Sequence, residues 1–317
     1  MRKTINRVSL AGRVYDFKMA EKVCQKQGDN FGKTFINGTL DVATDENCLN
    51  IVQVHFTFVT EVTKKGAKNA TFAALKSIID NNKTVLTVGK DNAMMVKIET
   101  SLDLNDFYTD RNGDEQLVSA KRNEGGFVTI VSSLPAETDR FETANRFEMD
   151  MLINNTVYVE ADPEKNIEKD YLVVKGAVFN FMGAIKPVDF IVKNEGGIKY
   201  FESLDASPQN PTFTKVWGTI NNETIVTRKE EESAFGEPAV KEFVKNVREW
   251  IINGTLKPDA VYEIGNAETG ITLDEVKKAI ADREVYLAEV KKRSDEYKAS
   301  QAAAPAVAAT STEGFTF

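Results

Sequence analysis

The sequence predicts a mainly β protein with C-terminal helices, in which a five-stranded N-terminal barrel precedes a second, smaller β-rich domain. Three observations predict this fold. Apolar and polar residues alternate with a period of two over several stretches of residues 1–134, which is typical of half-buried strands. One short stretch among them has helical spacing instead. A long hairpin follows it, and Asn112-Gly113 at its tip supplies the positive φ angles of a tight reversal.

The first part is predicted to hold three strands, a helix and a hairpin. The strand and hairpin segments are 5–17, 35–44, 51–62, 94–121 and 127–134. Residues 71–81 are predicted to be helical because Phe72, Leu75 and Ile78 recur at helical spacing, and Asn69 or Thr71 can cap the helix. A helix between the third and fourth strands is the order of a five-stranded oligonucleotide-binding (OB) barrel.

Two motifs carry a family resemblance. Asn6-Arg7-Val8-Ser9-Leu10-Ala11-Gly12-Arg13 resembles the opening strand of bacterial and phage single-stranded DNA-binding proteins, and the hairpin with Tyr108-Thr109-Asp110-Arg111-Asn112-Gly113 resembles that family's long hairpin. The resemblance covers about residues 5–134. It implies an OB fold that binds single-stranded DNA without sequence preference during replication or recombination. In a phage protein this would take place in the host cytoplasm.

Composition narrows the function classes. The chain has 317 residues, enough for two domains, and no apolar run long enough to cross a bilayer. A single histidine, His55, and two cysteines provide too few ligands for a transition-metal site, and the low cysteine count favours a reducing, cytoplasmic compartment. Glycine-loop, nucleophile-elbow and zinc motifs are absent from the sequence. We therefore expect no enzyme activity, no cofactor and no metal.

Charge is distributed unevenly along the chain. The net charge is −8, but residues 1–100 carry 15 Lys/Arg against 10 Asp/Glu, and the remainder carries 25 against 38. The excess of basic residues in residues 1–100 indicates an anionic partner near the N-terminus. The alternative is that the uneven charge arose by chance among residues on solvated faces.

The candidate DNA-binding residues combine aromatic rings with cations. Aromatic rings stack on bases and cations contact phosphates. The stacking candidates are Tyr15, Phe17, Phe35, Phe107 and Tyr108, and the phosphate candidates are Arg7, Arg13, Lys33, Lys64, Lys65 and Arg111. For Tyr15 and Phe17 the alternative is that a second layer covers them as core, and for Lys64 and Lys65 it is a solvated loop.

The rest of the chain is predicted from weaker signals. Strand-like segments lie at 149–160, 172–181, 188–193, 198–204 and 213–227. Residues 174–181 echo residues 10–17, so the second domain could repeat the first. An apolar stripe predicts a helix over 237–253. Thr272 and Glu275 form a capping-box pattern that opens another helix, which reaches about residue 299.

These observations divide the chain into four parts: an OB-fold single-stranded DNA-binding domain (1–135), a second β-rich domain with a helix (146–265), a C-terminal helix (271–299) and a flexible tail (300–317). The tail ends in Glu313, Phe315 and Phe317. In the family that this chain resembles, such a tip often recruits replication proteins, so we expect a partner to bind there. The alternative is a tail without a binding role. The sequence is compatible with a monomer or an oligomer. The competing function is a non-enzymatic β-scaffold for protein interaction or assembly.

Overall fold

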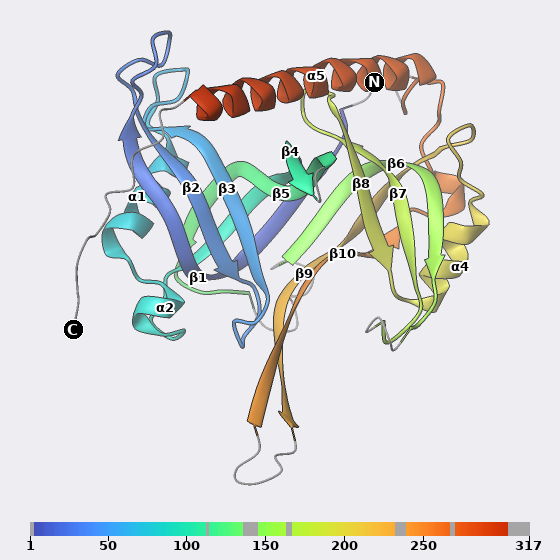
Figure 1. Cartoon of the computed structure of the whole chain (residues 1–317), viewed down its shortest axis with the longest axis horizontal. Helices are drawn as coiled ribbons and strands as arrows, with labels where there is room; N and C mark the ends of the chain where they lie inside the picture. Colours follow the sequence, from blue (N-terminus) through green and yellow to red (C-terminus); the bar gives the residue numbers. More distant parts are fainter. Residues whose placement is uncertain are drawn as a thin grey trace, which may run out of the picture.

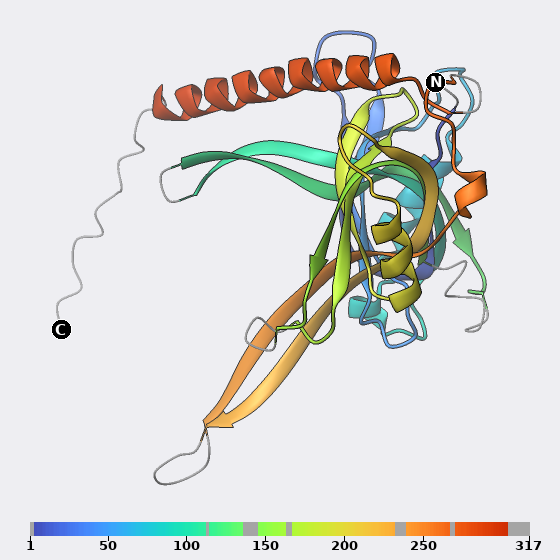
Figure 2. The same cartoon turned by 90° about the vertical axis from the view of Figure 1, so that its right-hand side faces the viewer.

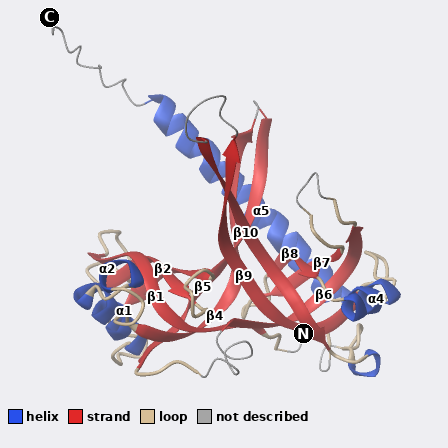
Figure 3. Ribbon diagram, turned by 90° about the horizontal axis from the view of Figure 1, so that it is seen from below, coloured by secondary structure: helices blue, strands red, loops and turns tan. Residues whose placement is uncertain are grey.

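A computed structural model of the chain describes residues 3–111, 114–135, 145–162, 167–231, 239–266 and 270–303. Helices cover the outer ends of a mainly β body, and one long helix crosses it (Figures 1 and 3). The strands are β1 (Asn6–Val23), β2 (Thr34–Ala43), β3 (Ile51–Thr60), β4 (Met95–Arg111), β5 (Asp114–Val131), β6 (Asn145–Val159), β7 (Tyr171–Phe179), β8 (Ile185–Val192), β9 (Thr212–Glu231) and β10 (Ala239–Thr255). The helices are α1 (Ala70–Asn81), α2 (Val85–Val88), α4 (Glu195–Ser203) and α5 (Leu273–Ala303), with a 3₁₀ turn at Pro258–Ala260.

Strands β1 to β5 form a closed ring in the order β1-β2-β3-β5-β4-β1. Strand β1 closes it by pairing with β2 along one half and with β4 along the other, and β3 pairs with β5 in parallel. Helix α1 follows β3, is capped by Asn69, and buries Phe72, Leu75 and Ile78. The mainly β fold and the predicted OB strand order are confirmed.

Gly12 allows β1 to change partner. A Cβ atom at this position would lie 2.1 Å from the carbonyl oxygen of Ala43, a backbone atom that cannot move aside. We expect Gly12→Ala to lower the free energy of unfolding by about 1–3 kcal/mol, the usual cost of overpacking. Gly196→Ala in α4 is the matched control, because its nearest neighbour atom is 3.8 Å away. Urea unfolding would contradict this account if both variants behaved alike.

Strands β6 to β10 form a second ring with the same order as the first. The order is β6-β7-β8-β10-β9-β6, β8 and β10 pair in parallel, and α4 follows β8 as α1 follows β3. Three predictions are corrected. The helix expected at 237–253 is strand β10, so a single C-terminal helix remains, and the strand expected at 198–204 lies mostly in α4. The sequence echo does not join equivalent strands, because residues 174–179 belong to β7, the second strand of its ring, whereas residues 10–17 belong to β1, the first strand of its ring.

The two rings pack together as one body. Strands β1 and β6 pair through residues 6–10 and 145–149, and one apolar core cluster runs through both rings. Phe147 pairs with Val8 across the junction, and inside the second ring its side chain lies 5.1 Å from Phe190 and 5.4 Å from Trp250. Lys186 pairs with Asp103 across the same junction at 2.5 Å. These contacts hold the outer faces of the two rings in a defined relation.

Each ring extends one hairpin to the same side of the molecule, β4–β5 from the first and β9–β10 from the second (Figure 2). Helix α5 lies along the β4–β5 hairpin. The predicted capping box opens it, since Thr272 Oγ1 accepts from the Glu275 amide at 3.2 Å and Glu275 Oε2 accepts from the Thr272 amide at 2.9 Å. Arg283 then reaches Asp106 on β4, and Lys298 reaches Glu115 on β5 at 2.7 Å. The helix therefore covers one face of this hairpin and leaves the other face open.

Candidate nucleic-acid interface

A bulge in β1 decides which aromatic side chains reach its outer face. Before the bulge, between Val14 and Asp16, alternate residues such as Val14 are buried; after it the phase changes, and Met19 becomes buried. Phe17 follows the new phase and packs against the core, so its predicted outward placement is wrong. Tyr15 stays half-buried and lines a groove between the rings.

A second irregularity exposes an aromatic pair on β2 and β3. The pairing of these strands shifts between Ile36 and Gly38. On β3 the shift breaks the alternation, so Phe56 is buried but Phe58, two residues later, is 38% exposed. The Phe58 ring lies against Phe35 with centroids 4.3 Å apart. The outer face of β2–β3 therefore presents a two-ring surface.

Phe127 on β5 extends this surface. Gly125 and Gly126 form a bulge opposite Thr100 just before it, and a Cβ at Gly126 would fall 2.0 Å from the Glu99 carbonyl oxygen. Phe127 is 75% exposed and lines the same surface hollow as Phe58. We call Phe35, Phe58 and Phe127 the aromatic platform.

Two lysine-bearing loops flank the platform. The β1–β2 loop (24–33) lines a hollow with Phe58, and Lys33 in it donates to Asn30 Oδ1 at 3.0 Å. The β3–α1 loop (61–69) carries the exposed residues Lys64 and Lys65. The Glu61 amide donates to the Thr34 carbonyl at 3.2 Å and joins the two loops. Four candidate residues, Lys33, Phe35, Lys64 and Lys65, are thus brought into one region.

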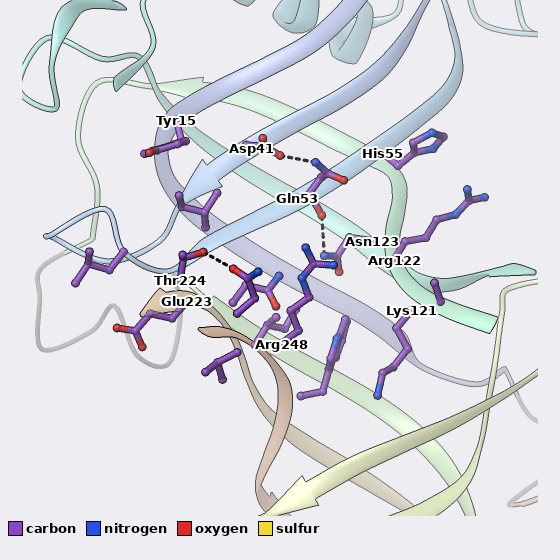
Figure 4. Close-up of a pocket in the computed structure, with 18 residues that line it drawn as sticks. Tyr15, Asp41, Gln53, His55, Lys121, Arg122, Asn123, Glu223, Thr224 and Arg248 are labelled. Carbon is purple, nitrogen blue, oxygen red and sulfur yellow. Dashed lines mark hydrogen bonds between the residues drawn. The ribbon is translucent and has the colours of Figure 1, made fainter. Parts of the chain in front are cut away.

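A groove of about 500 Å³ runs between the outer face of the first ring and the base of the β9–β10 hairpin (Figure 4). Tyr15, Gln53, His55 and Arg122 line it from β1, β3 and β5, and Arg248 lines it from β10. Gln53 organises the wall of the first ring. Its Nε2 donates to Asp41 Oδ1 at 2.8 Å, and its backbone carbonyl accepts from Asn123 Nδ2 at 2.9 Å. Burial raises the pKa of Asp41 above its ordinary value.

Several polar side chains beside this groove contact the carboxylate of Glu124. Its carboxylate lies 3.0 Å from His55 Nδ1 and 3.0 Å from Arg122 Nε, and it accepts from Thr57 Oγ1. His55 is therefore a polar residue of the outer sheet face. Among the described residues, no group of three His, Cys, Asp or Glu side chains is close enough to hold a metal ion. No described helix has the length and apolarity to span a membrane.

The remaining candidate arginines lie away from the platform. Arg7 donates to Glu148 at 2.9 Å where the rings join. Burial alone would raise the pKa of Glu148, but hydrogen bonds from Lys215 and Arg7 lower it. Arg13 is largely buried and pairs with Glu46 at 3.5 Å. Both arginines are already neutralised by neighbouring carboxylates.

The hairpin candidates divide between its two faces. Tyr108 faces α5, and Lys291 Nζ lies 5.3 Å from its ring centroid. Phe107 points to the opposite face and is 39% exposed. Strand alternation puts Phe107 on the face of Ala120 and Arg122, which line the groove. Arg111 ends β4, but its side chain lies outside the described residues, as do Glu313, Phe315 and Phe317.

Sequence reasoning missed Phe58, Phe127, Arg122 and Arg248. Phe58 continues the alternation of a buried strand, so only the bulge reveals its exposure. Gly125-Gly126 was an available signal for Phe127, because paired glycines inside a strand favour a bulge. Arg248 fell within a predicted helix, and nothing in the sequence placed it beside the first ring.

The sequence matches no curated protein. A solved structure of a deletion variant of the single-stranded DNA-binding protein from Thermus aquaticus is similar, with a TM-score of 0.44 and 11% identity over 81% of this chain and 96% of that chain. The model of the YorF family matches residues 4–293. The chain therefore belongs to the YorF family.

Proposed function

We propose that this protein binds single-stranded DNA on the outer face of its first ring, without strong sequence preference. The observation that carries the proposal is the aromatic platform, Phe35, Phe58 and Phe127, with Lys33, Lys64 and Lys65 on the adjoining loops. In OB rings the face of strands 2 and 3 and the neighbouring loops are where oligonucleotides bind. Every base has a π-face, so stacking on such rings tolerates any sequence and contributes about 1–3 kcal/mol per base.

The charges around the platform predict how binding responds to salt. Each phosphate neutralised on a single strand contributes about −0.7 to the slope of log K against log salt concentration. Contacts from the three lysines give a slope of about −2. The acidic remainder of the chain makes no comparable contribution, so the slope should be shallow for a protein that binds nucleic acid.

Fluorescence anisotropy of a labelled oligo-dT, at low and moderate salt, tests the proposal. We expect saturable binding that weakens with salt, and much weaker binding to duplex DNA of equal length, because paired bases cannot stack on the platform. Failure to bind at micromolar protein and low salt would sink the proposal.

A second candidate is a β-scaffold that binds another protein. It is favoured by the ion pairs of Arg7 and Arg13, which leave the candidate cations scattered rather than gathered on a single face. The anisotropy experiment separates the two functions, since a scaffold requires no affinity for oligo-dT.

The biological role we propose is the non-enzymatic coating of single strands during phage DNA replication or recombination, in the host cytoplasm. Residues 313–317 would then recruit replication proteins. Deleting these five residues should leave oligo-dT binding unchanged and abolish capture of a replication partner; retained capture would contradict this role of the tail.

A further inference from the structure

We propose that the groove between the two rings holds the continuation of the same single strand, and that Arg248 binds one of its phosphates there. This inference rests on the proposed function. It adds a second contact region, supplied by the β9–β10 hairpin, to the aromatic platform of the first ring.

The first argument is the state of Arg248. It projects from β10 into the groove, and its side chain is exposed (Figure 4). In the described part of the chain it has no hydrogen-bond or ion-pair partner, whereas Lys121 pairs with Asp189 and Arg122 with Glu124 in the same lining. A guanidinium presents a planar fork of donors that matches a phosphate group.

The second argument is the chemistry of the opposite wall. Tyr15 and His55 supply rings to this wall, and the amides of Gln53 and Asn123 lie beside them, fixed by hydrogen bonds to Asp41 and to the Gln53 backbone carbonyl. A wall of rings and amides facing an unpaired guanidinium suits a nucleotide, whose base stacks while its phosphate is bound. The volume of about 500 Å³ lies within the range of ligand sites.

The third argument is continuity with the platform. The outer face of β3 carries Gln53 and His55 in the groove and Phe58 on the platform. The five residue steps from Gln53 to Phe58 span about 17 Å at the rise of a β-strand. One extended strand can therefore follow β3 from the platform into the groove without crossing the body of the protein.

Tryptophan fluorescence can report on this groove by itself. Trp250 lies in its lining, and Trp217 is the other tryptophan of the chain. A full-length Trp217→Phe protein leaves Trp250 as the single emitter. We expect an oligo-dT of about 30 nucleotides to change its emission saturably, at the concentrations that saturate anisotropy.

The test compares Arg248→Ala with Arg293→Ala in that background. Arg293 is an exposed arginine on α5 that pairs with Glu289. Arg248→Ala should weaken binding about tenfold, as the loss of one charged hydrogen-bonding group does, and should reduce the steepness of the salt slope by about 0.7. Arg293→Ala should change neither quantity.

The outcomes separate this inference from the proposed function. Oligo-dT binding that Phe58→Ala weakens, with unchanged Trp250 emission and no effect of Arg248→Ala, would overturn the groove and leave the platform standing. Absence of oligo-dT binding to the parent protein would overturn both. A Trp250 response that Arg248→Ala shifts about tenfold to higher DNA concentration supports the strand path through the groove.

Discussion

The Phe35→Ala/Phe58→Ala variant is expected to bind oligo-dT at least about 30-fold more weakly than the parent protein. Both rings lie on the outer face of β2–β3 in contact with each other, Phe58 exposed and Phe35 half-buried. Each stacked base contributes about 1–3 kcal/mol, so loss of two removes at least about 2 kcal/mol, and 1.4 kcal/mol is a factor of ten. Anisotropy titrations of a labelled oligo-dT at constant salt measure the loss.

A matched control exists in the second ring. Phe181 lies in the turn between β7 and β8, and its side chain is 86% exposed. Phe181→Ala should leave oligo-dT affinity unchanged, because this phenylalanine is remote from the aromatic platform. Circular dichroism should show both variants folded. If the double variant bound as tightly as the parent, stacking on the aromatic platform would be wrong.

Arg283→Met is expected to cause the largest loss of stability, about 3–5 kcal/mol. The Asp106 carboxylate on β4 is fully buried and accepts from Arg283 at 2.9 and 3.3 Å and from Ser119 Oγ at 2.5 Å. Removing the guanidinium leaves a buried charge with one hydroxyl partner. Because Arg283 fastens α5 to the β4–β5 hairpin, limited proteolysis should cut within residues 273–303 well before it cuts the rings, and urea unfolding should show the lost stability.

Two further variants isolate the buried charge as the cause. Lys298→Met removes an exposed ion pair with Asp110 and Glu115 on the same hairpin and should lower the stability far less than Arg283→Met does, because solvent screens an exposed pair. Asp106→Leu combined with Arg283→Met replaces the pair by apolar side chains and should recover most of the loss. If the double replacement were no more stable than Arg283→Met alone, the uncompensated charge could not be the reason.

The first ring could be predicted because its signals are local. Period-two alternation in β1, β2 and β3, the helical spacing of Phe72 and Leu75, and the Asn69 cap all concern residues close in sequence. The bulges in β1 and β3 carry no such local signal, unlike the one at Gly125-Gly126 in β5. Because of the shift after Val14, Phe17 packs against the core. Because of the shift between β2 and β3, Phe58 is exposed.

The second ring was harder because long-range pairing decides it. Strand β10 carries apolar residues at positions that also fit a helical stripe, and its many Lys and Glu residues favour helices. Its pairing with β9 along almost its whole length overrides that preference. The same pairing places Arg248 beside the first ring. For this reason the sequence pointed to only part of the proposed interface, through Lys33, Phe35, Lys64 and Lys65 near the platform, and hardly at all to the groove.

Photo-crosslinking tests the central claim most directly. Oligonucleotides that carry 5-iododeoxyuridine at successive positions would be bound to the full-length protein and irradiated, and the crosslinked peptides identified by mass spectrometry. We predict crosslinks to Phe35, Phe58 and Phe127, because these rings would contact the bases. Crosslinks confined to β7 and β8 of the second ring, or none under conditions of saturated binding, would contradict the assignment of the binding face to the first ring.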